Sequence, residues 1–222
     1  MRAIILADGD APTRAGLDAA WPGWSDGVEL IVAADGGARL GPALGLAIDR
    51  WVGDGDSIGE ADLQHLRDAG IPVDRAASDK DESDTELAVL AALEGGATDL
   101  VIVGALGGVR FDHALANVAL LGMPALTGRT ASLLAADGRV RLLTGPGELV
   151  LEGRIGDIVS LLPFGADVDG VVTEGLRYPL RGETLAAGPA RGLSNVRTGT
   201  TARVSIERGR LLVVETPANL GA

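Results

Sequence analysis

The stretch Leu30-Ile31-Val32-Ala33-Ala34-Asp35-Gly36-Gly37 joins an unbroken apolar run to an aspartate and two glycines. An apolar run without polar alternation is typical of a strand buried on both faces of a parallel sheet. Three further runs in the first half, at residues 3–7, 51–52 and 100–103, also end at aspartate or glycine. Because the carboxyl ends of parallel strands meet at one edge of a sheet, these endings predict a shared ligand-binding crevice.

Helical spacing appears between these runs. Leu63 and Leu66 lie one turn apart, Ser83-x-x-Glu86 forms a capping box, and Asp112 can cap the segment that follows it. The predicted helices cover residues 60–69, 83–93 and 113–121. Alternation of strands and helices predicts an α/β, Rossmann-like parallel-sheet domain over residues 1–136.

The second half has a different rhythm. Short strand-like runs are separated by glycine and proline turns, and no helical pattern is present. The runs are residues 139–143, 148–151, 157–163, 169–173, 202–207 and 210–215. They predict an all-β sandwich or small barrel over residues 137–222.

Composition narrows the functional classes. The chain has 222 residues, of which 46% are hydrophobic, and a formal charge of -12 from 31 acidic and 19 basic side chains. That balance argues against a nucleic-acid partner, and the absence of cysteine excludes disulfides and thiol nucleophiles. No apolar stretch approaches the ~20 residues that span a bilayer, so we expect a cytoplasmic protein without a membrane partner.

Asp54 and Asp56 follow the third strand at i, i+2 spacing. In an extended segment this spacing puts both carboxylates on the same side, where they can hold a hard cation such as Mg²⁺ together with substrate phosphates. The alternative interpretation is that each Asp-Gly pair only forms a turn.

Cationic groups lie close to the predicted crevice. Lys80, the only lysine, stands among four carboxylates in residues 79–84 and precedes a predicted helix. Its ammonium can meet a phosphate beside the metal, or it can be a solvated surface group. Arg110 and His113 follow a glycine-rich strand end and can bind phosphates, although Asp112 could be a simple helix cap and His113 a surface residue.

Several familiar sites are excluded. The chain has no Gly-Lys-Ser/Thr P-loop, no G-x-G-x-x-G after a strand, and only two histidines. One rival remains, because Gly55-Asp56-Ser57-Ile58-Gly59 matches the G-x-S-x-G elbow of serine hydrolases, with His113 as a possible base. Against it, hydrolases of that type place the histidine late in the chain, and no histidine follows His113.

Five ordered motifs resemble those of the thiamine pyrophosphokinase family. They run nearly the full length of the chain and match both its α/β and its β half. The motifs are Asp35-Gly36-Gly37, Gly53-Asp54-Gly55-Asp56-Ser57, Lys80-Asp81-x-x-Asp84-x-x-Leu87-Ala88, Gly107-Gly108-x-Arg110-Phe111-Asp112-His113 and Gly192-x-Ser194-Asn195.

The resemblance implies transfer of diphosphate from ATP to the hydroxyl of thiamine, with release of AMP, by a homodimer that binds thiamine between its subunits. It implies that four aspartates form the catalytic set. Asp54, Asp56 and Asp84 would bind Mg²⁺, and Asp35 would lie among these metal ligands or next to them. It further places Ser194 and Asn195 on thiamine. The nucleotide would be bound by Lys80, Asp81, Gly107, Gly108, Arg110, Asp112 and His113.

The chain departs from the family pattern in two places. Gly55 stands where the family often has a bulky residue, and Val196 and Arg197 follow Ser194-Asn195, near which an aromatic residue commonly stacks on thiamine. A pyrophosphokinase for another alcohol, such as a hydroxymethylpterin, therefore stays an alternative. A non-catalytic nucleotide-binding relative is a further one.

Overall fold

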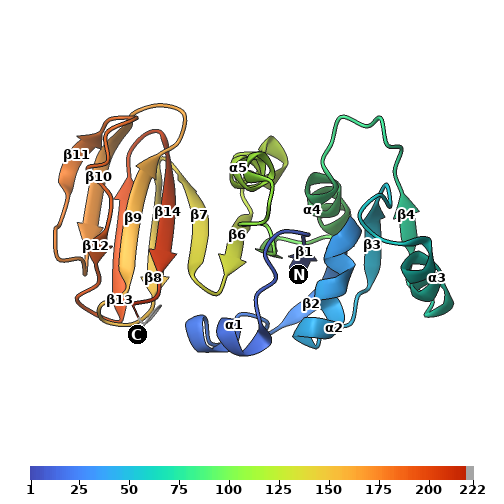
Figure 1. The fold of residues 1–222 in the computed structure, drawn as a ribbon. Helices are drawn as coiled ribbons and strands as arrows, with labels where there is room; N and C mark the ends of the chain where they lie inside the picture. The colour runs from blue at the N-terminus through green and yellow to red at the C-terminus, as the bar shows by residue number, and fades with distance from the viewer. Residues whose placement is uncertain (219–222) are drawn as a thin grey trace. The chain divides into compact units, whose positions relative to one another are not determined.

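The computed structural model describes residues 1–218. Its contacts divide the chain into two compact units, Met1–Ala136 and a second that begins at Asp137 (Figure 1). The first unit mixes strands and helices, and the described part of the second contains strands and no helix.

Unit 1 is built on a parallel sheet whose strand order is β6-β5-β1-β2-β3-β4. The order reverses at β1, which pairs with β2 on one side and with β5 on the other. In open sheets, ligands bind beyond the carboxyl ends of strands near such a reversal. The strands are β1 (Arg2–Leu6), β2 (Val28–Ala34), β3 (Arg50–Gly53), β4 (Val73–Arg75), β5 (Asp99–Val103) and β6 (Thr130–Ala135).

Helices and 3-10 turns connect these strands. The longest, α4, packs against β1, β2 and β3, and its N-terminus is capped by Ser83, whose Oγ accepts from the Glu86 N–H at 3.2 Å. The elements are α1 (Arg14–Ala20), η1 (Asp35–Arg39), α2 (Leu40–Leu44), α3 (Glu60–Asp68), α4 (Asp84–Glu94), α5 (Phe111–Leu120) and η2 (Pro124–Leu126). No helix among residues 1–218 is long and apolar enough to cross a membrane.

The start of α5 corrects one prediction. The helix begins at Phe111, so Asp112 lies inside its first turn and is not the capping residue. The cap position belongs to Arg110, whose side chain makes no capping hydrogen bond. Asp112 pairs with Arg110 instead, its Oδ1 lying 2.9 Å from Nε.

Unit 2 contains two antiparallel arrangements, β12-β9-β14-β7 and β11-β10-β13-β8. Side chains from both, such as Leu161 of β9 and Val204 of β13, belong to one buried core. The strands are β7 (Gly138–Thr144), β8 (Gly147–Glu152), β9 (Ile158–Pro163), β10 (Val168–Glu174), β11 (Arg181–Leu185), β12 (Asn195–Val196), β13 (Thr201–Ile206) and β14 (Arg210–Thr216).

The sequence pattern missed eight of the elements in the two units, namely α1, η1, α2, β4, η2, β6, β11 and β12. Two of them, β4 and β12, span only three and two residues, too few to show a period. The sequence of β11, Arg-Gly-Glu-Thr-Leu, does not alternate apolar and polar residues, so it gives no strand signal. In the structure only its last residue, Leu185, is buried.

Candidate active site

Asp35 stands at the carboxyl end of β2, as the first residue of η1. It is 2% exposed and its backbone has a φ of 42°, in the left-handed region that is uncommon for residues other than glycine. The Ser57 N–H donates to Asp35 Oδ2 at 3.2 Å. The other carboxylate oxygen, Oδ1, has no hydrogen-bond partner among residues 1–218.

Asp54 follows β3, and here the structure corrects the predicted extended segment. Gly55 has a φ of 86°, and the Asp56 N–H donates back to Asp54 Oδ1 at 3.0 Å, so the chain turns. A side chain at position 55 would be strained in this conformation. The two aspartates therefore do not face one cation from a straight strand, and the charge of Asp56 instead helps to raise the pKa of Asp35.

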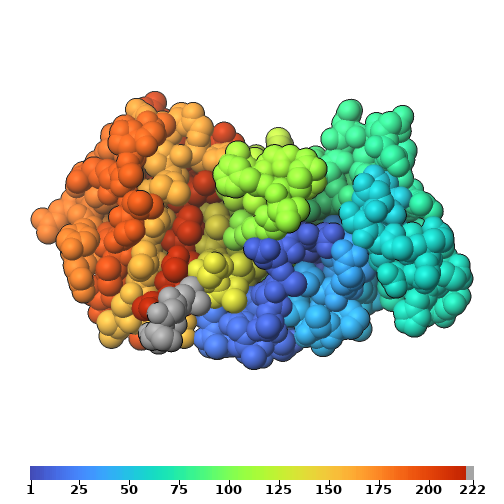
Figure 2. All heavy atoms as spheres, viewed as in Figure 1, coloured from blue at the N-terminus to red at the C-terminus, as the bar shows by residue number. Residues whose placement is uncertain are grey.

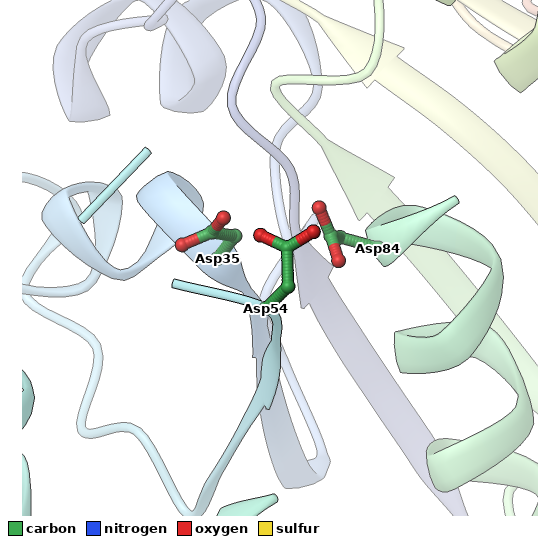
Figure 3. A group of neighbouring side chains, drawn as sticks. All are labelled: Asp35, Asp54 and Asp84. Atoms are coloured by element: carbon green, nitrogen blue, oxygen red, sulfur yellow. The ribbon is translucent and has the colours of Figure 1, made fainter. Parts of the chain in front are cut away.

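A third carboxylate comes from the first residue of α4. Asp84, Asp54 and Asp35 each place one carboxylate oxygen within 4.8 Å of the others. Figure 3 shows the three side chains converging from η1, the turn after β3 and the start of α4. The structure thus brings together three of the four predicted aspartates and leaves Asp56 just outside the group.

Lys80 lies against this group. Its Nζ is 2.9 Å from Asp54 Oδ2 and 3.0 Å from Asp84 Oδ1, and its side chain is 12% exposed. The alternative of a solvated surface lysine is therefore wrong. Asp81, which the resemblance placed on the nucleotide, is exposed.

Burial and charge shift the ionisation of the cluster. Burial, helped by the charges of Asp84 and Asp56 and opposed by the bond from Ser57, raises the pKa of Asp35 to about 6. The bond from Lys80 lowers the pKa of Asp54. Desolvation alone would lower the pKa of Lys80, but its contacts with Asp54 and Asp84 outweigh that effect and raise it.

The donor set suits a hard divalent cation. All three convergent groups are carboxylates, and Asp35 Oδ1 is buried and has no hydrogen-bond partner within residues 1–218, as expected of an oxygen that can ligate a cation. Mg²⁺ and Mn²⁺ prefer such oxygen ligands. With Lys80 in place the three carboxylates and one ammonium carry a formal charge of about -2 when all are ionised, which a divalent cation would neutralise.

The residues after β5 that were predicted to bind the nucleotide lie at the surface of unit 1. Gly107 and Gly108, with φ of 72° and 82°, are exposed in the loop after β5, as are Arg110, Asp112 and His113 at the start of α5. In the space-filling view the α5 segment lies on the outside of the unit (Figure 2). Pairing with Arg110 lowers the pKa of Asp112 to about 2.

The hydrolase motif does not form a catalytic pair. Ser57 Oγ donates to Asp56 Oδ1 at 2.9 Å, within the same turn. No histidine bonds to this hydroxyl among the described residues, whereas a hydrolase of this type needs a histidine base that a third group orients. The structure therefore does not favour the serine hydrolase alternative.

Unit 2 carries a cavity of about 410 Å³, whose lining includes Tyr178, Leu193 and Asn195. Pockets of this size hold small organic ligands. The Asn195 amide is buried and is occupied by main chain, because Nδ2 donates to the Tyr178 carbonyl at 2.7 Å and Oδ1 accepts from the Tyr178 N–H at 3.0 Å. Ser194 is exposed in a left-handed conformation, with φ of 59°.

Tyr178 is an aromatic residue at this cavity that the sequence pattern did not single out. Its side chain is 63% exposed, although it is the only tyrosine of the chain. It stands 17 residues before Asn195 in the sequence, between β10 and β11, whereas the family pattern commonly has an aromatic residue near the Ser-Asn motif. The sequence did offer one signal for it. Tyr178 precedes a proline and lies outside every apolar run, so it was not expected to belong to the hydrophobic core and was free to contact a ligand.

Two family models match the chain. "Thiamin pyrophosphokinase, catalytic domain" matches residues 24–131, and "Thiamin pyrophosphokinase, vitamin B1 binding domain" matches residues 148–211. Among curated proteins, the thiamine pyrophosphokinase of Bacillus subtilis is 27% identical over 193 residues, which cover 86% of this chain and 89% of that protein.

Solved structures agree with these matches. The crystal structure of thiamine pyrophosphokinase from Bacillus subtilis superposes with a TM-score of 0.84 at 26% identity, covering 98% of this chain and 99% of that one. The enzyme from Geobacillus thermodenitrificans shares the fold, with a TM-score of 0.81 at 24% identity and 99% coverage of both chains. From both family models and from these relatives, we conclude that the chain belongs to the thiamine pyrophosphokinase family of diphosphotransferase enzymes.

Proposed function

We propose that this enzyme transfers a diphosphoryl group from ATP to the hydroxyl oxygen of thiamine, in a reaction that depends on Mg²⁺ and gives thiamine diphosphate and AMP. The observation that carries the proposal is the convergence of Asp35, Asp54 and Asp84 at the carboxyl edge of a parallel sheet. In a Rossmann-like layer this edge is where nucleotides bind.

Asp54 and Asp84, with Asp35 beside them, would hold Mg²⁺ on the triphosphate, and Asp56 would add negative charge from the adjoining turn. A bound divalent cation supplies charge neutralisation for the transferring phosphates. The hydroxyl oxygen of thiamine attacks the β-phosphorus, and the bond from that phosphorus to the oxygen bridging it to the α-phosphorus breaks. That oxygen leaves with AMP.

Positioning rather than strong base catalysis would account for the rate, as in other phosphoryl transfers. Lys80 is the cation nearest the carboxylates and would place its ammonium on the polyphosphate. Gly107 and Gly108 would let the nucleotide approach the main chain, with Asp81, Arg110, Asp112 and His113 around it. All of these groups but Lys80 are exposed and reachable from solvent.

Thiamine would bind at the cavity of unit 2, with Tyr178 as the stacking aromatic residue. Because its amide is already bonded to the main chain of Tyr178, Asn195 would act by fixing that residue rather than by contacting the substrate. Ser194, exposed beside it, would contact thiamine through its hydroxyl.

A homodimer with a shared site is part of the proposal, as is a cytoplasmic location. The acidic group belongs to unit 1 and the cavity to unit 2, and Val109, Phe111 and Leu115 form an exposed apolar patch on unit 1. Mixing Asp54→Asn with Asn195→Ala protein should restore activity if sites are shared, because a mixed dimer has one site without either lesion. Confirmed subunit exchange without restored activity would refute sharing.

Incubation with ATP, Mg²⁺ and a panel of alcohols, followed by mass detection of products, tests the reaction. AMP together with thiamine diphosphate is the expected result. A diphosphorylated hydroxymethylpterin would instead assign the alternative substrate. Tight ATP binding without turnover of any alcohol would indicate a non-catalytic nucleotide-binding relative.

A further inference from the structure

Asp35 reaches the carboxylate group from a backbone conformation that residues other than glycine adopt infrequently. Its φ of 42° lies in the left-handed region, where a residue with a Cβ is strained. Such residues persist only where the surrounding structure holds them. Two contacts that hold Asp35 are the Ser57 N–H, which donates to its carboxylate, and a buried donor to its main-chain carbonyl.

The donor to that carbonyl is the indole of Trp51. Nε1 lies 2.9 Å from the Asp35 oxygen, and both groups are buried. Trp51 is itself fixed, because its side chain is 0% exposed and its main chain is paired with Ala33 of β2 and Val73 of β4. A Cβ at Gly53, two residues further along β3, would lie 2.9 Å from the Asp35 Cβ, so the strand also closes on Asp35 directly.

We propose that Trp51 is a positioning residue for the metal site, whose indole N–H keeps Asp35 in the left-handed conformation that turns its carboxylate toward Asp54 and Asp84. This inference rests on the proposed function, since it assumes that these carboxylates bind a divalent cation. Without the indole bond, the main chain of Asp35 can relax toward the right-handed region, which moves its Cβ and withdraws its carboxylate from the group.

A merely structural tryptophan would affect stability alone, and the chain offers a matched control for that case. The indole of Trp21 also donates to a main-chain carbonyl, that of Ala135, at 2.8 Å. Trp21 belongs to the same hydrophobic core as Trp51. Its carbonyl partner is not part of an acidic residue, so loss of this bond should leave the carboxylate group unchanged.

The test compares Trp51→Phe and Trp21→Phe with the unsubstituted protein. Phenylalanine keeps an aromatic ring and removes the donor. Mn²⁺ affinity is measured by electron paramagnetic resonance of the free ion, without nucleotide, and stability by thermal unfolding. We expect both variants to lose similar stability and only Trp51→Phe to bind Mn²⁺ more weakly, by at least about fivefold, a change of about 1 kcal/mol.

The outcomes separate this inference from the function on which it rests. Equal Mn²⁺ affinity of the two variants would refute the positioning role and leave the metal site intact. Failure of the unsubstituted protein to bind Mn²⁺ would refute the metal site, and the positioning role with it.

A second measurement on the unsubstituted protein serves if Trp51→Phe does not fold. The three tryptophans give three indole ¹⁵N–¹H resonances, which Trp21→Phe and Trp24→Phe assign. Addition of Mg²⁺ should move the Trp51 resonance, because its acceptor is the carbonyl of Asp35, and should leave that of Trp21 in place. A Trp51 resonance that stays unmoved at saturating Mg²⁺ would overturn the proposal.

Discussion

Replacement of Lys80 by methionine removes the ammonium from the acidic group and keeps a side chain of similar length. In the metal-free protein Lys80 Nζ contacts Asp54 at 2.9 Å and Asp84 at 3.0 Å. Without it, three carboxylates would face one another, and the charge of the more exposed Arg75, which also acts on Asp54, would offset them only in part. We expect Lys80→Met to destabilise the metal-free protein and to make its stability depend strongly on Mg²⁺.

The magnitude follows from burial. Loss of one partner from a fully buried ion pair costs about 3–5 kcal/mol. The side chains here are 12%, 11% and 28% exposed, so partial screening reduces the cost to about 2–3 kcal/mol. For a chain of this length about 1 kcal/mol shifts Tm by about 2–4 °C, which gives a loss of about 4–12 °C.

Scanning calorimetry with and without Mg²⁺ measures this effect, and titration calorimetry measures Mg²⁺ affinity. Mg²⁺ should restore most of the lost stability and should bind at least about fivefold more tightly than to the parent, because it no longer displaces or is repelled by an ammonium. Arg67→Met is the matched control, since its pair with Glu60 at 3.0 Å is exposed and should contribute little. A Lys80→Met protein as stable as the parent without Mg²⁺ would refute the reasoning.

Three further predictions follow from the site. Because the pKa of Asp35 is raised to about 6, Mg²⁺ affinity should fall about tenfold between pH 7 and pH 5 in the parent and not in Asp35→Asn. Without metal, ionisation of Asp35 should cost the parent about 3 kcal/mol of stability relative to Asp35→Asn as the pH rises from ~4 through 6, whereas carboxylates with a lowered pKa, such as Asp54, act in the opposite sense on both proteins. Identical pH profiles of the two proteins would contradict the assignment. Asp54→Asn should lower kcat at least ~100-fold with the fold preserved by circular dichroism, whereas Ser57→Ala should keep most activity; the reverse pattern would revive the hydrolase. Tyr178→Leu should raise the KM for thiamine about 3–10-fold and leave that for ATP unchanged in steady-state assays, with Tyr178→Phe close to the parent, and equal KM values for thiamine in all three proteins would exclude stacking.

Periodicity predicted the carboxylate-bearing strand ends but not which aspartates converge. Asp35 and Asp54 follow apolar runs, and the capping box located the helix that presents Asp84, so these positions could be derived from local patterns. The displacement of Asp56 could not, because it depends on the left-handed Gly55, and i, i+2 spacing assumes an extended chain.

Contacts between segments that are distant in the sequence could not be predicted from the spacing of residues. The pairing of Lys80 with Asp54 spans 26 residues and depends on the path of the loop between β4 and α4. The position of Tyr178 depends on the β10–β11 pairing and on the Asn195 amide, 17 residues away in β12. Since β11 lacks apolar alternation, nothing local indicated that pairing.

The fate of labelled phosphate tests the central claim most directly. ATP carrying ³²P in the β-phosphate is incubated with thiamine, Mg²⁺ and the enzyme, with Asp54→Asn protein as the control, and the products are separated. Diphosphoryl transfer predicts that the label appears in thiamine diphosphate, that AMP is unlabelled, and that Asp54→Asn yields almost none of either. Label retained in ADP, with thiamine monophosphate as the other product, would contradict the account.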